Sequence, residues 1–149
     1  MAQGTPRIEH VKYIRATTDA VWRALTDARE TRKYFFDQAQ ITSDFTAGSG
    51  VRYTRGDDPA TQAVVVQGEI LSAEPGRRLQ HTFALPDIDE PPSQVCWDIS
   101  PFGRTHVKLA LIHQGFAGES RTYQRMKNTW AGVLTRLQTL LENGGHGWQ

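Results

Sequence analysis

The stretch SRTYQRMKNTWAGVLTRLQTLLEN (120–143) has the pattern of one long amphipathic helix. Its apolar residues recur every three or four positions, which places them on one stripe of a helix: Tyr123, Met126, Trp130, Val133, Leu134, Leu137, Leu140 and Leu141. Ser120 suits the N-cap, and Asn143-Gly144-Gly145 is typical of a helix end. At ~1.5 Å per residue, such a helix is about 35 Å long and needs a broad apolar surface against its stripe. The preceding sequence supplies strands, so we expect a curved sheet wrapped around this helix.

Composition limits the classes of function. A chain of 149 residues predicts one domain, over 8–144, with flexible termini at 1–7 and 145–149. The 17 basic and 16 acidic residues give a net charge of +1, so nucleic acid is not an expected partner. No apolar run reaches the ~18 residues of a membrane span. The single cysteine, Cys96, excludes an intrachain disulfide and favours a cytoplasmic setting. The five histidines lack the spacing of a zinc set, and we expect neither a metal nor a cofactor.

The segments before the long helix alternate with a period of two or carry short helical patterns. Residues 8–15 predict a first strand, Thr18 suits the N-cap of a short helix, and 29–36 predict a second short helix. Six further strands are expected at 41–45, 51–55, 62–73, 79–85, 95–100 and 105–113. Their short connections favour antiparallel pairing. The order of one strand, two short helices, six strands and a long helix predicts an α+β fold with about seven strands.

Strand alternation also predicts which side chains face the helix. One face gathers large apolar groups and two histidines: Val51, Tyr53, Leu79, His81, Phe83, Leu85, Val95, Trp97, Ile99, Val107, Leu109, Leu111 and His113. Cys96 falls on the opposite face. A strongly curved sheet need not close completely on a helix, so we expect a partly open apolar cavity between them.

Five segments follow one family pattern in order: VWRALTD (21–27), RKYFF (32–36), GSGVRY (48–53), GEILSAEPGRRLQHTF (68–83) and W..VL..L..LLENG (130–144). The chain resembles the bacterial relatives of the activator of heat-shock-protein ATPase, in the START-like (SRPBCC, birch-pollen-allergen-like) superfamily. The resemblance implies a helix-grip fold, in which a curved antiparallel sheet surrounds a C-terminal helix and leaves an apolar cavity. Thr129 departs from the pattern, which usually has a glycine there. The superfamily includes lipid and polyketide binders, cyclases, hydrolase-like members and co-chaperone domains.

Candidate site residues come from the inner face, the long helix and the two short helical segments. His81 and His113 could act as general acid and base or orient a ligand, or each could be held by hydrogen bonds at a strand end. Tyr53 could present its phenol to a ligand or simply pack. No catalytic set is assigned, and His81, His113 and Tyr53 are the candidates. The expected cavity lining is Trp22, Tyr34, Phe35, Tyr53, Phe83, Trp97, Leu111, His113, Tyr123, Met126, Trp130 and Leu134.

These features are compatible with three hypotheses for the function. The leading hypothesis is a domain that binds a small hydrophobic molecule of lipid, polyketide or aromatic type. The second is a chaperone-associated interaction domain, or a homodimer, and an exposed apolar patch would favour it. The third is a cyclase- or hydrolase-like enzyme that uses His81 or His113 with Tyr53. Polar cavity groups with shifted pKa values would favour the enzyme.

Overall fold

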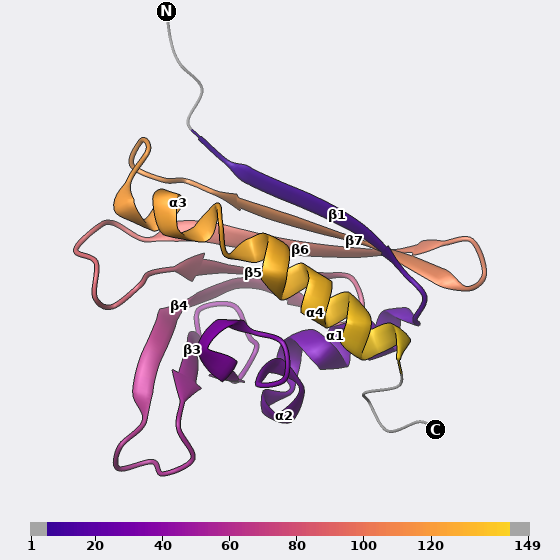
Figure 1. The fold of residues 1–149 in the computed structure, drawn as a ribbon, viewed down its shortest axis with the longest axis horizontal. Helices are drawn as coiled ribbons and strands as arrows, with labels where there is room; N and C mark the ends of the chain where they lie inside the picture. Colours follow the sequence, from indigo (N-terminus) through magenta and orange to yellow (C-terminus); the bar gives the residue numbers. More distant parts are fainter. Residues whose placement is uncertain (1–5, 144–149) are drawn as a thin grey trace, which may run out of the picture.

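The computed structural model describes residues 6–143, so the termini expected to be flexible lie almost entirely outside the described part. Figure 1 shows the elements in chain order. They are β1 (Ile8–Ile14), α1 (Thr18–Thr26), α2 (Ala28–Thr31), the 3₁₀ helix η1 (Phe36–Gln38), β2 (Gln40–Ser43), β3 (Gly50–Arg55), β4 (Ala63–Glu74), β5 (Arg78–Phe83), β6 (Ser93–Phe102), β7 (His106–Gln114), α3 (Arg121–Met126) and α4 (Trp130–Glu142).

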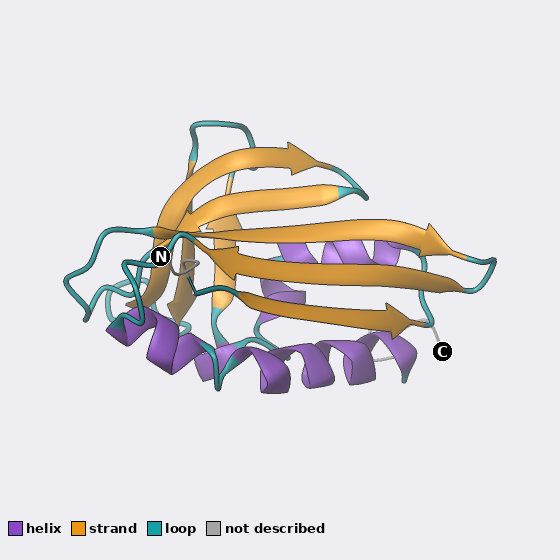
Figure 2. Ribbon diagram, turned by 90° about the horizontal axis from the view of Figure 1, so that it is seen from above, coloured by secondary structure: helices purple, strands orange, loops and turns teal. Residues whose placement is uncertain are grey.

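The strands form one antiparallel sheet in the order β1-β7-β6-β5-β4-β3-β2. Figure 2 shows that the sheet is strongly curved and that α3 and α4 run along one of its faces. Gly68 lies where β4 passes very close to β5, since a Cβ there would lie 2.0 Å from the Thr82 carbonyl oxygen. The predicted α+β fold, with seven strands around a C-terminal helical segment, is confirmed.

Alternation identified the inner face correctly. Every residue expected there is buried, and so are Met126, Trp130, Val133, Leu134, Leu137 and Leu141 of the helical stripe. Tyr123 and Leu140 are only half-buried. Cys96 is half-buried on the opposite face, as predicted. The sheet and the helix stripe therefore share one apolar core.

The short helices differ from expectation at their ends. The N-cap of α1 is Thr17 rather than Thr18, and its hydroxyl accepts a hydrogen bond from the amide of Ala20 at 3.0 Å. Both threonines suit a cap, so sequence could not choose between them. The helix expected over 29–36 ends at Thr31. Tyr34 and Phe35 are both buried, and consecutive residues of a helix do not face the same side, so the chain leaves the helix to bury both rings.

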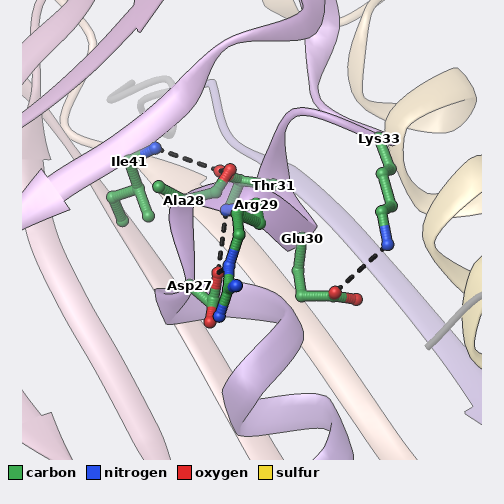
Figure 3. A network of polar contacts seen from close by, with 7 residues as sticks. All are labelled: Asp27, Ala28, Arg29, Glu30, Thr31, Lys33 and Ile41. Atoms are coloured by element: carbon green, nitrogen blue, oxygen red, sulfur yellow. Dashed lines mark hydrogen bonds and ion pairs between the residues drawn. The ribbon is translucent and has the colours of Figure 1, made fainter. Parts of the chain in front are cut away.

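Thr31 also fixes the start of the edge strand β2 (Figure 3). Its buried hydroxyl accepts a hydrogen bond from the amide of Ile41 at 3.0 Å. Asp27 caps α2 through the amide of Arg29 at 2.8 Å. The bond between Thr31 and Ile41 joins the end of α2 to β2 and so ties together the two ends of the aromatic segment between them.

The long C-terminal helix is broken, which corrects the expectation of one helix over 120–143. Ser120 caps α3 as predicted, but residues 127–129 form turns before α4 begins at Trp130. The Thr129 hydroxyl donates to the Arg125 carbonyl at 2.8 Å, and its amide donates to the Met126 carbonyl at 3.0 Å. A threonine that bonds back to the preceding turn bends a helix, and a shortened backbone bond tightens it.

Candidate functional site

Trp130 lies at the centre of a buried aromatic cluster between the sheet and α4. Its ring centroid lies 6.0 Å from Phe35, 6.1 Å from Phe83, 5.6 Å from Trp97 and 5.9 Å from His113. These rings come from the segment before η1 and from β5, β6 and β7. The structure therefore brings together five of the residues expected to line a cavity, with four of the rings packed around Trp130.

His113 is held by a complete chain of hydrogen bonds. The Trp130 indole N–H donates to Nδ1 of His113 at 3.0 Å, so Nδ1 is the acceptor nitrogen and Nε2 carries the proton. Nε2 donates to the Ser93 hydroxyl at 2.7 Å, and Ser93 donates to the Phe83 carbonyl at 3.2 Å. Burial, and then the nearness of His81, lowers the pKa of His113 to about 3. His113 is therefore a neutral, fully bonded residue that joins α4 to β7.

His81 and Tyr53 form a second buried polar pair with much looser geometry. Nδ1 of His81 lies 2.6 Å from the Thr82 carbonyl, which can only accept, so Nδ1 carries the proton and Nε2 is an acceptor. The Tyr53 hydroxyl is the donor to Nε2, at 3.5 Å. Burial lowers the pKa of His81 and raises that of Tyr53, so both groups are neutral near pH 7. A separation of 3.5 Å lies beyond the usual hydrogen-bond range.

A pocket of about 530 Å³ opens on the surface where the C-terminal helix breaks. We call it the mouth pocket. It is lined by Phe36, Asp37, Arg55, Ala63, Val64, Val65, Leu85, Pro86, Asp87, Arg125 and Thr129. Half-buried Phe36 stacks on Phe35 at 4.6 Å, and Phe35 stacks on Tyr53 at 4.2 Å. A continuous row of three rings thus leads from the mouth pocket to the Tyr53–His81 pair.

The rim of the mouth pocket is fastened by charged contacts. Both terminal nitrogens of Arg125 bond to the carboxylate of Asp87, at 3.1 and 2.9 Å, and this bond lowers the pKa of Asp87. Glu90 accepts hydrogen bonds from the amides of Arg121 and Thr122 at 2.9 and 3.1 Å. The connection between β5 and β6 is therefore tied to α3 at two points.

The remaining predicted lining residues are spread more widely. Tyr34, Leu111, Met126 and Leu134 are buried, and the Tyr34 hydroxyl donates to the Ala24 carbonyl at 2.8 Å. Tyr123 is half-buried, and its ring lies 5.2 Å from Phe116. Trp22 is half-buried at a different surface pocket of about 560 Å³, which Phe45 and Ala73 also line. The structure therefore does not place Trp22 at the mouth pocket.

Sequence reasoning missed Ser93, Phe36 and Phe116 as site residues. Ser93 has the same parity as Val95 and Trp97, so extending the alternation by one step would have placed it on the inner face. Phe116 contacts His113 at 4.4 Å from a loop, where alternation gives no signal.

Within residues 6–143, no group of three or more histidine, cysteine, aspartate or glutamate side chains is placed to hold a metal ion. Among the helices that the structure describes, none has the length and apolar character needed to cross a membrane.

A seven-stranded antiparallel sheet that grips a C-terminal helical segment is a helix-grip fold. Residues 15–142 match the family model described as "Activator of Hsp90 ATPase homolog 1-like protein", and the chain belongs to this family. The resemblance found in the sequence is thereby confirmed.

Solved structures share the fold at low sequence identity. Protein MLL2253 from Mesorhizobium loti has a TM-score of 0.73 and 22% identity, over 93% of this chain and 98% of that one. The Aha1 dimer from Colwellia psychrerythraea has a TM-score of 0.72 and 15% identity, over 94% and 98%. CalU16 from Micromonospora echinospora has a TM-score of 0.71 and 23% identity, over 90% and 73%. A comparison with curated protein sequences gave no significant match.

Proposed function

We propose that this domain binds a small hydrophobic molecule between the inner face of the sheet and α4, and that the ligand enters through the mouth pocket. The observation that carries the proposal is the row of rings formed by Phe36, Phe35 and Tyr53. Phe36 is accessible from the pocket, whereas Tyr53 lies in the core. A ligand that displaces Phe36 and Phe35 replaces ring–ring contacts by ligand–ring contacts, so little apolar burial is lost.

The backbone beside Phe36 supports such a displacement. Asp37 and Gln38 both have positive φ angles, of 58° and 53°. Non-glycine residues in this region carry strain of ~1 kcal/mol or more each. This strained 3₁₀ segment contains Phe36, which lines the pocket, so relief of the strain would offset part of the cost of displacing that ring.

A flat aromatic or an aliphatic molecule fits the lining. Lipids, polyketides and aromatic compounds therefore all remain candidate ligands. The polar groups at the rim include the mutually bonded Arg125 and Asp87. The half-buried Cys96 thiol agrees with the expected cytoplasmic setting, which remains part of the proposal.

Thermal unfolding in the presence of fused-ring aromatic and medium-chain aliphatic molecules tests the function. A ligand at a hundred times its dissociation constant stabilises the folded state by ~2.7 kcal/mol. For a domain of this size, the melting temperature rises by roughly 5–10 °C. Quenching or a shift of tryptophan emission should accompany binding, because Trp130 and Trp97 lie in the cluster.

Two alanines of β4 provide matched variants. Ala63 lines the mouth pocket and Ala73 lines the pocket beside Trp22, and both are half-buried. Ala63→Trp should fill the mouth pocket and abolish the ligand-induced shift, whereas Ala73→Trp should leave the shift intact. The absence of any shift across the library with the unmodified protein would refute the proposal, and so would binding that only Ala73→Trp removes.

A second candidate function is binding to an Hsp90-type chaperone, since the family's description names an activator of the Hsp90 ATPase. The outer face carries an exposed apolar group that supports it: Tyr13 and Phe102 are 46% and 54% exposed, and their rings lie 4.7 Å apart. Tyr13→Ser with Phe102→Ser should abolish binding to purified chaperone and leave the melting temperature unchanged. The Colwellia psychrerythraea relative was solved as a dimer, so a second copy of the chain is the alternative partner for this surface. Sedimentation of the protein alone detects such self-association. Self-association that these substitutions abolish would contradict the chaperone contact.

A further inference from the structure

We propose that the ligand carries a hydroxyl group, which is seated between the hydroxyl of Tyr53 and Nε2 of His81 at the inner end of the row of rings. This inference rests on the proposed function and names the chemistry of its ligand. Tyr53 is 3% exposed and His81 is 1% exposed, so neither reaches bulk water.

The two groups offer one donor and one acceptor. The Thr82 carbonyl fixes the proton of His81 on Nδ1, which leaves the Nε2 lone pair directed at Tyr53. The Tyr53 hydroxyl can donate to that lone pair, but at 3.5 Å the bond is weak. Two buried groups that satisfy each other so loosely gain by binding a third group between them.

A hydroxyl is the group that matches both. Its oxygen accepts a hydrogen bond from the Tyr53 hydroxyl, and its own O–H donates a hydrogen bond to Nε2 of His81. A carbonyl would satisfy Tyr53 and leave Nε2 without a donor, whereas an apolar group would satisfy neither. Two hydrogen bonds of ~2.8 Å that meet near the tetrahedral angle set their partners about 4.5 Å apart, so the pair must open by about 1 Å. Phe35, which stacks on Tyr53, is the ring whose displacement gives that room.

His113, the other histidine on the inner face, shows why the ligand hydroxyl binds at the Tyr53–His81 pair. Both nitrogens of His113 have short partners, at 3.0 and 2.7 Å, and the Ser93 hydroxyl has its own acceptor. A ligand hydroxyl there would have to break a good bond to form another. The ligand hydroxyl is therefore bound by the Tyr53–His81 pair and not by His113 and its hydrogen-bond partners.

The test compares 2-naphthol with 2-methylnaphthalene, which differ in a hydroxyl and a methyl group of similar size. Dissociation constants are measured by tryptophan quenching at pH 7 for the unmodified protein, Tyr53→Phe and Tyr34→Phe. Tyr34 is the matched control, because it is equally buried and its hydroxyl is bonded to the Ala24 carbonyl. The ratio of the two dissociation constants is compared between proteins, which cancels the different hydrophobicity of the two ligands.

Tyr53→Phe should weaken the binding of 2-naphthol relative to that of 2-methylnaphthalene by about tenfold. Tyr34→Phe should leave the ratio of the two dissociation constants unchanged. The ¹⁵N shift of Nε2 of His81 should move when 2-naphthol binds and stay unchanged with 2-methylnaphthalene. Binding of both molecules with a ratio that Tyr53→Phe leaves unchanged would overturn this inference alone. A failure to bind either molecule, or any member of the wider library, would overturn the proposed function and the inference with it.

Discussion

The indole nitrogen of Trp130 donates a hydrogen bond to Nδ1 of His113 at 3.0 Å, in the middle of the apolar core. This bond joins the first residue of α4 to β7, and Ser93 extends it to β6. Because both side chains are fully buried, the bond fixes how α4 is rotated against the sheet. Together with the bond to Ser93, it gives both ring nitrogens of His113 a partner within the protein.

Trp130→Phe keeps an aromatic ring but removes the donor, so Nδ1 of His113 is left buried without a partner. We expect a loss of about 1–3 kcal/mol of unfolding free energy. Urea unfolding of Trp130→Phe, His113→Leu and the double variant measures the coupling between the two residues. The double variant should lose less than the sum of the single ones. Losses that add within ~0.3 kcal/mol would show that the bond has no energetic role.

Acid should destabilise the fold through His113. Its pKa is about 3 in the folded state and ~6.5 in the unfolded chain, so between these values the unfolded chain binds a proton that the folded chain does not. Stability is therefore retained above pH 6.5 and falls as the pH drops, by up to ~1.4 kcal/mol per pH unit. The lowered pKa of His81 acts in the same direction.

Urea unfolding at pH 7, 6 and 5 separates this effect from the titration of carboxylates. His113→Gln should be less stable at pH 7 but should lose less on acidification. Parallel pH profiles for the two proteins would mean that His113 binds its proton equally in both states.

The face of each strand was predictable because alternation is a local property. Val95, Trp97 and Ile99 needed only a period of two to be placed inward. The hydrogen bonds of His113 were not predictable, because they depend on side chains from β6 and α4 that meet only in the folded chain. The mouth pocket escaped prediction for the same reason, since η1, β3, β4 and the helix break all contribute to its lining.

The break in the C-terminal helix escaped prediction because the apolar stripe continues through it. Lys127 and Thr129 keep right-handed helical dihedrals, so Met126 and Trp130 still face the core on either side. Periodicity reports which side is buried, and it does not detect a side chain that bonds back to the preceding turn.

Thr129→Ala removes the hydroxyl that bonds to the Arg125 carbonyl. Alanine also has the higher helix propensity, so we expect more helical signal in far-UV circular dichroism and a gain of about 0.5 kcal/mol in unfolding free energy. Lys127→Ala is the control, because it changes propensity at the same break without removing that bond. A loss above ~1 kcal/mol in Thr129→Ala would show that the hydroxyl stabilises the break.

Gly68→Ala should destabilise the sheet, because the new methyl group would lie 2.0 Å from the Thr82 carbonyl oxygen. Overpacking against backbone costs about 1–3 kcal/mol or more. Gly50→Ala is the matched control, since a Cβ at Gly50 meets no atom within 4 Å. Equal stability of the two variants in urea would contradict the close approach of β4 and β5.

The most direct test of ligand binding between the sheet and α4 is an NMR measurement of nuclear Overhauser effects from the methyl group of bound 2-methylnaphthalene. We expect contacts to the rings of Phe36, Tyr53 and Trp130, and we expect these contacts to disappear in Ala63→Trp. Contacts confined to Trp22 and Phe45, or no contacts at saturating ligand, would contradict binding between the sheet and α4.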